Sequence, residues 1–234
     1  MLELLPNLYR FTGQSPRGET LYTYLVVRPD GNLLLPCQDG GVRDHMDDIK
    51  RLGGVATQFV THNHDVDGNL CETVHERFGA RLAYHAAEHD AIAKKTTCPA
   101  DEFGDDGLQV DADFEAIYFP SCCVGSSVYH WQQDGQHRLF TSHVIDHVDG
   151  QWRVGLDLWQ YRNLRDWGDA ATPPDPRPRI ATLADLPLDQ SLPNVWREGQ
   201  QEYHTFTDAT RTTFAQALRT QIEAESPHVA ATAG

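Results

Sequence analysis

The segment from Thr61 to Asn69, Thr-His-Asn-His-Asp-Val-Asp-Gly-Asn, carries side chains suited to metal chemistry. His62 and His64 stand one residue apart, so both imidazoles can face one ion from a single turn. Asp65 and Asp67 add carboxylate oxygens, and imidazole with carboxylate donors suits zinc or iron. A His-x-His pair without further signals is also typical of surface-loop histidines, so the surrounding sequence has to decide between the two interpretations.

The flanks of this segment predict where it lies. Residues Val55–Val60 are apolar and partly β-branched, which predicts a buried strand. Leu70, Val74 and Phe78 recur at helical spacing, which predicts an amphipathic helix. The two histidines are therefore expected at the mouth of a strand, on a turn that leads into a helix.

This arrangement resembles the metallo-β-lactamase fold superfamily, in which a strand leads into Thr-His-x-His-x-Asp-His, a glycine pair and a helix. His62, His64 and Gly68 match that motif. Val66 stands at the position of the family's aspartate, and Asp67 at the position of its third histidine. The motif is thus kept in its first half and altered in its second.

Two later blocks extend the resemblance, which covers roughly residues 1–165. Residues Pro120–Ser126 are similar to the family's Pro-Gly-His-Thr-Pro-Gly-Ser, with Cys122 at the position of a histidine ligand. Residues Leu139–His143 are similar to Leu-Phe-Thr-Gly-Asp, with His143 in place of the metal-bridging aspartate. The order and spacing of the three blocks follow the family.

The resemblance implies an α/β fold, an αββα sandwich with mixed sheets flanked by helices. It implies one metallo-β-lactamase-like domain over residues 1–234, in which residues 227–234 are expected to fray. It also implies a hydrolase. Fold membership does not select a substrate, and a glyoxalase II-like small ester, thioester or lactone is the default by elimination.

Carried over by position, the family's first metal would be bound by His62, His64, Cys122 and His143. Three nitrogen donors and one sulfur donor suit zinc, and iron is the alternative. A second ion is not expected, because Val66 cannot ligate and a neutral imidazole cannot bridge two cations. The resemblance therefore implies at most one ion.

Asp65 or Asp67 would be the nearest general base, since a carboxylate beside a metal-bound water can take its proton. Four protein ligands would make the zinc structural, whereas three would leave a position for water. The family's late histidine is expected near residues 194–199, where none occurs; His204 is a few residues away.

Two other interpretations stay open. The chain can be a metal-free binding or regulatory module that has kept the fold. Alternatively, Cys122 or Cys123 can act as a nucleophile paired with His143 or His62, because a thiol beside an imidazole is able to do so. The sequence shows no third group that would orient such a pair.

Composition limits the partners. The chain has 19 lysines and arginines against 34 aspartates and glutamates, a net charge of −15, which argues against nucleic acid or an anionic membrane. A small molecule is therefore the expected partner, and the oligomeric state is not determined. Arginine outnumbers lysine and aspartate outnumbers glutamate, as in halophilic proteins, although a GC-rich genome also favours arginine.

The five cysteines form no Cys-x-x-Cys pair and no even framework, so reduced thiols in a cytoplasm are expected. Residues 1–6 lack the basic region and apolar core of a signal peptide. No run reaches the roughly 18–20 apolar residues needed to span a bilayer. A cytoplasmic protein is the expectation.

The rest of the chain alternates between strand and helix patterns, which favours an α/β architecture. The expected strands are Leu8–Phe11, Thr20–Val27, Leu33–Leu35, Arg81–His85 and Phe114–Phe119, and the expected helices are Arg43–Leu52, Ala86–Lys95 and Thr207–Glu223. A hairpin is expected about Asp134-Gly135. Loops are expected over Thr172–Pro178 and, unless it forms a short hairpin, over Thr97–Asp113.

Two groups of residues near the third block are expected to lie outside any site. Asp146 and His147 are assigned to a solvated loop. The aromatic residues of the region are assigned to core or interface packing: Trp152, Trp159, Tyr161 and Trp167.

Overall fold

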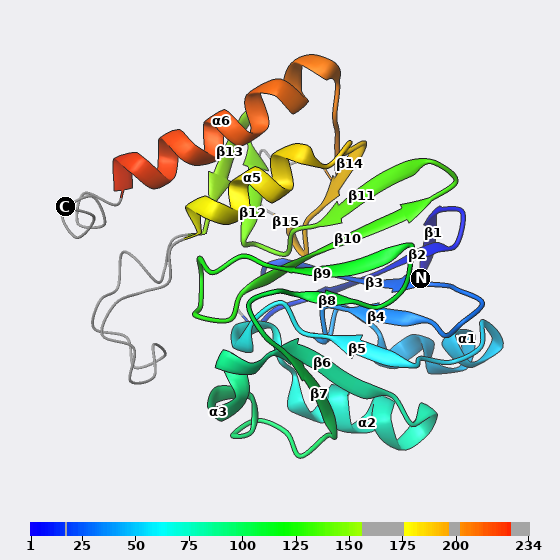
Figure 1. Cartoon of the computed structure of the whole chain (residues 1–234). Helices are drawn as coiled ribbons and strands as arrows, with labels where there is room; N and C mark the ends of the chain where they lie inside the picture. Colours follow the sequence, from blue (N-terminus) through cyan, green and yellow to red (C-terminus); the bar gives the residue numbers. More distant parts are fainter. Residues whose placement is uncertain (17, 156–175, 197–201, 226–234) are drawn as a thin grey trace. The chain divides into compact units, whose positions relative to one another are not determined.

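The computed structural model describes residues 1–16, 18–155, 176–196 and 202–225 (Figure 1). The chain divides into two compact units. Unit 1 comprises Met1–Gly104 and Asn194–Arg197, and unit 2 comprises Asp105–Pro193 and Glu198–Gly234. The single domain expected over residues 1–234 stays a prediction.

Unit 1 is built on an eight-stranded sheet in the order β1-β2-β3-β4-β5-β6-β7, with β15 paired to β3. Its strands are β1 (Leu2–Leu5), β2 (Leu8–Gln14), β3 (Thr20–Val26), β4 (Leu33–Leu35), β5 (Thr57–Phe59), β6 (Arg81–His85), β7 (Ala100–Phe103) and β15 (Val195–Trp196). Strands β1 to β4 pair antiparallel, whereas β4 to β7 pair in parallel. The loops that follow β4, β5 and β6 therefore leave the sheet at the same edge.

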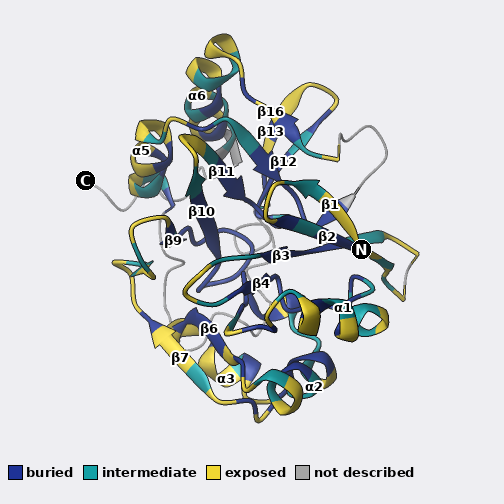
Figure 2. Cartoon of the chain, turned by 90° about the vertical axis from the view of Figure 1, so that its right-hand side faces the viewer, coloured by how far each residue is buried: buried dark blue, intermediate teal, exposed yellow. Residues whose placement is uncertain are grey.

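Short helices fill the crossovers between these parallel strands. They are η1 (Arg43–His45), α1 (Met46–Arg51), η2 (Asn63–Asp65), α2 (Gly68–Phe78), η3 (Ala86–Glu88) and α3 (His89–Ile92). The inner faces of α1 and α2 are buried through Ile49, Leu70 and Val74, and their outer faces are exposed (Figure 2). Helix α2 ends at Gly79, whose φ of 75° is the left-handed conformation that favours glycine.

Unit 2 has a six-stranded sheet in the order β16-β14-β11-β10-β9-β8 and a separate two-stranded sheet of β12 and β13. Its elements are β8 (Leu108–Gln109), β9 (Phe114–Tyr118), β10 (Ser127–Gln133), β11 (Gln136–Phe140), β12 (Ile145–Val148), β13 (Gln151–Val154), α5 (Arg177–Asp185), β14 (Gln190–Leu192), β16 (His204–Thr205) and α6 (Asp208–Glu225). No helix in the described part of the chain is long and apolar enough to cross a membrane.

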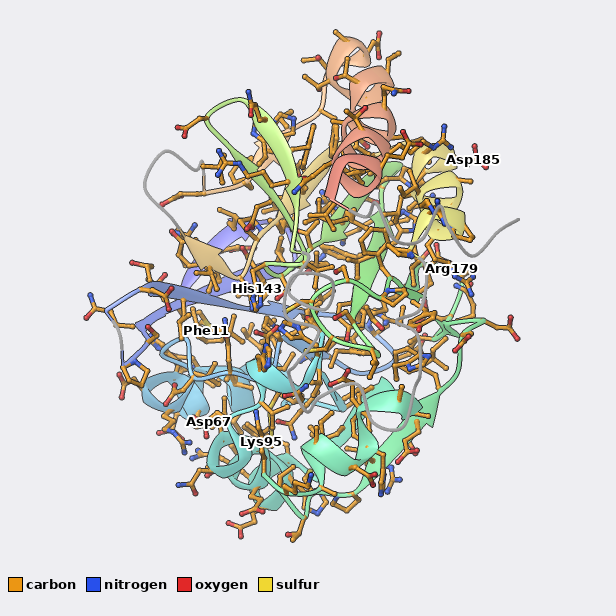
Figure 3. The ribbon with its side chains drawn as sticks, turned by 90° about the vertical axis from the view of Figure 1, so that its left-hand side faces the viewer. Phe11, Asp67, Lys95, His143, Arg179 and Asp185 are labelled. Carbon is orange, nitrogen blue, oxygen red and sulfur yellow. A yellow bond between two sulfur atoms is a disulfide. The ribbon has the colours of Figure 1, made fainter. Side chains whose placement is uncertain are left out.

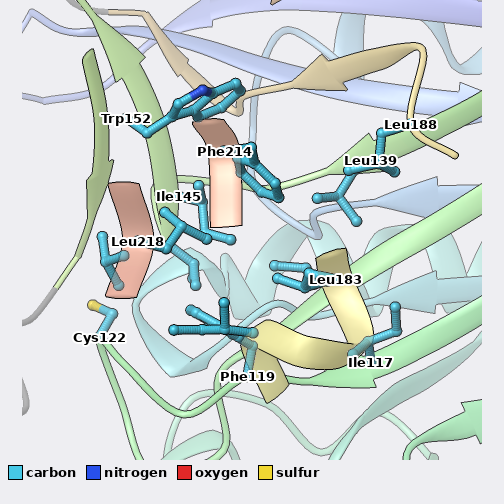
Figure 4. Close-up of a cluster of buried hydrophobic side chains, with 14 of the residues drawn as sticks. Ile117, Phe119, Cys122, Leu139, Ile145, Trp152, Leu183, Leu188, Phe214 and Leu218 are labelled. Atoms are coloured by element: carbon cyan, nitrogen blue, oxygen red, sulfur yellow. The ribbon is translucent and has the colours of Figure 1, made fainter. Parts of the chain in front are cut away.

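One apolar cluster joins helices α5 and α6 of unit 2 to its strands (Figure 4). Leu183 of α5 and Phe214 and Leu218 of α6 are buried in it together with Phe119 and Leu139. Burying each of these large side chains contributes about 1.5–3 kcal/mol. The cluster therefore fixes α5 and α6 on unit 2.

The predicted α/β class, with mixed sheets flanked by helices, is confirmed. The hairpin is also confirmed: β10 and β11 pair through a two-residue turn in which Asp134 and Gly135 have φ of 52° and 74°. The helix expected after the histidine segment is α2.

Three expectations about elements differ from the structure. The segment Thr97–Asp113 contains β7 and β8, which belong to different sheets and form no hairpin. The helix expected over Ala86–Lys95 is broken into η3 and α3 and ends at Ile92. The proline-rich Thr172–Pro178 was assigned to a loop, but Pro178 lies in the first turn of α5, where its missing N–H costs nothing.

The structure places part of the region after β11 in the core of unit 2. Asp146 and His147 belong to β12, and Asp146 is buried, so the assignment of these two residues to a solvated loop is wrong. Trp152 is buried in the apolar cluster, as predicted. Trp159, Tyr161 and Trp167 lie outside the described residues.

His204 is buried within this aromatic region, and this predicts how stability depends on pH. Its ring centroid lies 4.1 Å from that of His147 and 4.9 Å from that of Trp152. Burial, and secondarily His147, lowers the pKa of His204 to about 4. The unfolded imidazole titrates near 6.5, so the unfolded chain binds more protons between these values.

The contribution of neutral, buried His204 to the free energy of unfolding is therefore complete above about pH 6.5, and it is lost as the pH falls toward 4. Between pH 7 and pH 5 we expect the wild-type free energy of unfolding to fall by about 2 kcal/mol more than that of His204→Phe, which keeps a ring but does not titrate. Urea unfolding at both pH values measures the difference. The exposed His89→Gln variant should behave as wild type, and an equal loss in wild type and His204→Phe would contradict the account.

Candidate metal centre

The histidine segment lies at the carboxyl edge of the parallel strands of unit 1. Strand β5 ends at Phe59, and the chain then passes through Thr61 and His62 into η2 and α2. The backbone N–H of Asp67 donates to the carbonyl of Cys37, in the loop that follows β4, at 3.0 Å. Two neighbouring loops are thereby joined at this edge.

Unit 1 brings three candidate donors into this one turn. The side chain of His62 is fully buried, and its Nδ1 lies 3.4 Å from Oδ2 of Asp65. The ring of exposed His64 lies edge-on to that of His62, with centroids 5.2 Å apart. Metal-binding histidines commonly place one ring nitrogen against a carboxylate. The Asp65 carboxylate lies on the Nδ1 side of His62 within this turn.

Asn63, between the two histidines, is held by the next parallel crossover. Its backbone N–H and its side-chain amide donate to Oε2 of Glu88 at 3.0 and 2.7 Å. The ammonium of Lys95 donates to the carbonyl of Asn63. Glu88 is 1% exposed, so this carboxylate is a buried anchor for the backbone that carries His62 and His64.

Asp67, which stands at the position of a family ligand and is also predicted as a base, is labelled in Figure 3, and its partners have a structural role. Its Oδ1 accepts from the backbone N–H of Leu70 at 3.0 Å and so caps the N-terminus of α2. Arg43 donates to both of its oxygens at 3.3 and 3.4 Å and also pairs with Asp39 at 2.8 Å. The roles of Asp67 as base or ligand stay predictions.

The cysteines of unit 1 differ from the expectation of reduced thiols. Cys37 and Cys71 form a disulfide between the loop after β4 and the first turn of α2. The sequence could not indicate this pair, because 34 residues separate the two positions and only the parallel crossover brings them together. Cys98, Cys122 and Cys123 carry buried thiols.

Unit 2 brings together the two candidate ligands that replace family residues in the later blocks. Cys122 lies in the loop after β9, and His143 in the loop after β11. Sγ of Cys122 and Nε2 of His143 are 3.6 Å apart. Ser142 stands where the family has glycine and adopts a left-handed φ of 52°, which is uncommon for a residue with a side chain.

The loop that carries Cys122 is held by its own hydrogen bonds. The backbone N–H of Cys123 donates to Oγ of Ser126 at 2.7 Å, and the hydroxyl of Tyr118 donates to the carbonyl of Val124 at 2.9 Å. Cys122 and Cys123 are 3% and 1% exposed. The thiol of Cys122 is therefore a buried, fixed donor.

Candidate metal ligands thus occur in both units: His62, His64 and Asp65 in unit 1, and Cys122, Cys123 and His143 in unit 2. The four-residue ligand set inferred from the resemblance stays a prediction. Sequence reasoning missed Glu88 and Lys95 as supports of the histidine turn. The available signal was that Glu88 comes shortly after the strand expected over Arg81–His85.

No protein-family model matches the chain, and no curated protein sequence matches it. Solved structures do match. A variant of the HARLDQ-motif metallo-β-lactamase from Cronobacter sakazakii (Enterobacter sakazakii) aligns with a TM-score of 0.64 at 16% identity, over 99% of this chain and 98% of that chain.

Two further structures agree with this match. MEM-A1, a subclass B3 metallo-β-lactamase isolated from a soil metagenome library, gives a TM-score of 0.57 at 15% identity over 96% of this chain and 94% of its own. The metallo-β-lactamase SMB-1, bound to 2-mercaptoethanesulfonate, aligns with a TM-score of 0.55 at 14% identity, over 94% of this chain and 95% of that chain. The chain therefore has the metallo-β-lactamase fold, as the three sequence blocks predicted.

This structure gives a steric reason for the glycine at position 68, which the sequence motif shares with the family. A Cβ on Gly68 would lie 1.9 Å from the carbonyl oxygen of Lys95, the residue whose ammonium binds Asn63. We expect Gly68→Ala to force the start of α2 away from Lys95 and to lower the free energy of unfolding by about 1–3 kcal/mol.

Chemical denaturation measures this loss, and Gly104→Ala is the matched control because an added Cβ there meets no atom within 4 Å. A Gly68→Ala protein as stable as Gly104→Ala would show that this close approach does not exist in solution.

Proposed function

We propose that the chain is a metal-dependent hydrolase that binds one zinc ion through three of the four donors His62, His64, Cys122 and His143, with Cys122 and His143 among them, so that one position stays open for water. The contact of 3.6 Å between Cys122 and His143 carries the proposal. Neither residue is the family's own at its position, yet a sulfur donor and a nitrogen donor come together from two separate loops. A thiol–imidazole pair supplies half of a typical zinc coordination sphere.

The donor set fits one zinc ion. Imidazole nitrogens bind zinc at about 2.0–2.1 Å and thiolates at about 2.3 Å, and both are ordinary zinc ligands. A second ion does not fit, because Val66 offers no donor and the carboxylate of Asp67 is engaged by Arg43 and by the cap of α2. The buried environment of His62 keeps competing water away from its ring.

A bound zinc ion with an open coordination position supplies an activated water whose pKa falls to about 7. The protein contributes a fixed ligand turn, through the hydrogen bonds of Asn63 to Glu88, and a carboxylate on Asp65 that can hold a proton. If all four residues stay bound to the zinc ion, no coordination position is left for water and the ion is structural.

The substrate proposed is a small ester, thioester or lactone. The fold relatives support hydrolysis as the reaction class, and SMB-1 binds the small anionic thiol 2-mercaptoethanesulfonate. The net charge of −15 disfavours nucleic acid. A panel of small uncharged esters, thioesters and lactones is therefore the first screen.

Metal content tests the proposal. Protein expressed with zinc and iron available should contain about one zinc ion per chain, and His62→Ala should lose it together with hydrolase activity. His89→Ala is the control, because His89 is an exposed imidazole paired with Glu102 and should keep the ion. Two ions per chain would contradict the ligand set, and a folded protein without metal would favour the metal-free binding module.

Substituting each aspartate by asparagine distinguishes the role of Asp65 from that of Asp67. Asp65→Asn should leave the metal bound and lower kcat by about 100-fold or more, if Asp65 is the carboxylate that takes the proton. Asp67→Asn should keep kcat within a few-fold, because asparagine is an equally good N-cap for α2. Steady-state kinetics with metal analysis of each variant decides, and the reverse pattern would assign the proton transfer to Asp67.

A further inference from the structure

Two histidines of the β10–β11 hairpin face each other within unit 2. Nε2 of His130 lies 3.0 Å from Nδ1 of His137, and the two rings are stacked at an angle of 8° with centroids 5.2 Å apart. Both residues are outside the three family blocks. The hairpin turn at Asp134 and Gly135 brings them together.

A carboxylate orients the first of these rings. Glu115 lies directly opposite His130 in the β9–β10 register, and its Oε1 is 2.8 Å from Nδ1 of His130. The hydrogen of the His130 ring therefore lies on Nδ1, toward Glu115, and Nε2 presents its lone pair to His137. This is the carboxylate–histidine arrangement that supports metal-binding imidazoles.

The second ring is also held in place. The backbone N–H of His137 donates to Oδ2 of Asp189 at 2.8 Å, and Arg211 pairs with the other oxygen of Asp189. Burial, and secondarily His130, lowers the pKa of His137, so its ring is neutral at pH 7, as a ligand must be. Because Nε2 of His130 accepts, the ring hydrogen of metal-free His137 lies on Nδ1 at the 3.0 Å contact, and metal binding would move it to Nε2 of His137.

We propose that His130 Nε2 and His137 Nδ1 form a bidentate site for a divalent late transition metal, Cu²⁺ or Ni²⁺, separate from the candidate metal centre. Two nitrogens at about 2.1 Å from an ion and at a right angle to each other lie about 3.0 Å apart. That separation matches the observed 3.0 Å and suits the tetragonal geometry of Cu²⁺ and Ni²⁺. A tetrahedral zinc site would need a separation of about 3.4 Å.

Binding requires the two rings to turn so that both lone pairs point toward one ion. The carboxylates of Glu115 and Asp189 compensate the added charge, and water completes the coordination. The half-buried hairpin surface leaves His137 within reach of solvent.

Copper titration of the zinc-loaded full chain tests this site. Wild type should bind one Cu²⁺ more than His137→Gln, with electron paramagnetic resonance couplings from two nitrogens at that ion. His89→Gln is the matched control. His89 also pairs with a carboxylate, that of Glu102 at 2.6 Å, but it lies in α3 of unit 1 and not in the β10–β11 hairpin. Equal copper stoichiometry in wild type and His137→Gln would overturn the proposal.

A second variant covers the case in which His137→Gln does not fold. Glu115→Gln keeps the side-chain shape but weakens the support of His130, so the affinity of one Cu²⁺ should fall by about tenfold while zinc content stays unchanged. Copper affinities identical to wild type in Glu115→Gln would also overturn the proposal. A loss of zinc alone would concern only the candidate metal centre.

Discussion

The parallel pairing of β4, β5 and β6 is the constraint on which the histidine turn depends. In the observed register Leu34 lies beside Gln58, and Gln58 beside Leu82, so β4 and β5 end level and β6 continues two residues beyond them to His85. The loops that follow them then share one edge of the sheet. Hydrogen bonds from Asp67 to Cys37 and from Asn63 to Glu88 tie each loop to its neighbour. A shift of register in any of the strands would break these bonds and move His62.

Unit 2 positions its donors differently, at the ends of antiparallel strands. Cys122 and His143 follow β9 and β11, and their contact is possible because both strands flank β10. A thiol against an imidazole serves either metal binding or nucleophilic catalysis. The zinc proposal takes this pair as metal ligands.

The sequence predicted those features that depend on local patterns. Helix α2, the turn at Asp134-Gly135 and the buried strand before His62 were all evident from residue spacing. Features that depend on distant partners were not. The ion pair of Asp67 involves Arg43, 24 residues away, and the disulfide joins positions 34 residues apart. Helix α5 was missed because proline was interpreted as a loop residue although it is tolerated in a first helical turn.

The central claim of the proposed function is that Cys122 and the histidines His62, His64 and His143 supply the donors of one zinc ion, and X-ray absorption spectroscopy at the zinc edge of the zinc-loaded full chain tests it most directly. The account predicts one sulfur at about 2.3 Å and nitrogen donors at about 2.0–2.1 Å, with no second metal nearby, and loss of the sulfur in Cys122→Ser. A zinc ion without sulfur, or with another zinc at about 3.5–4 Å, would contradict it.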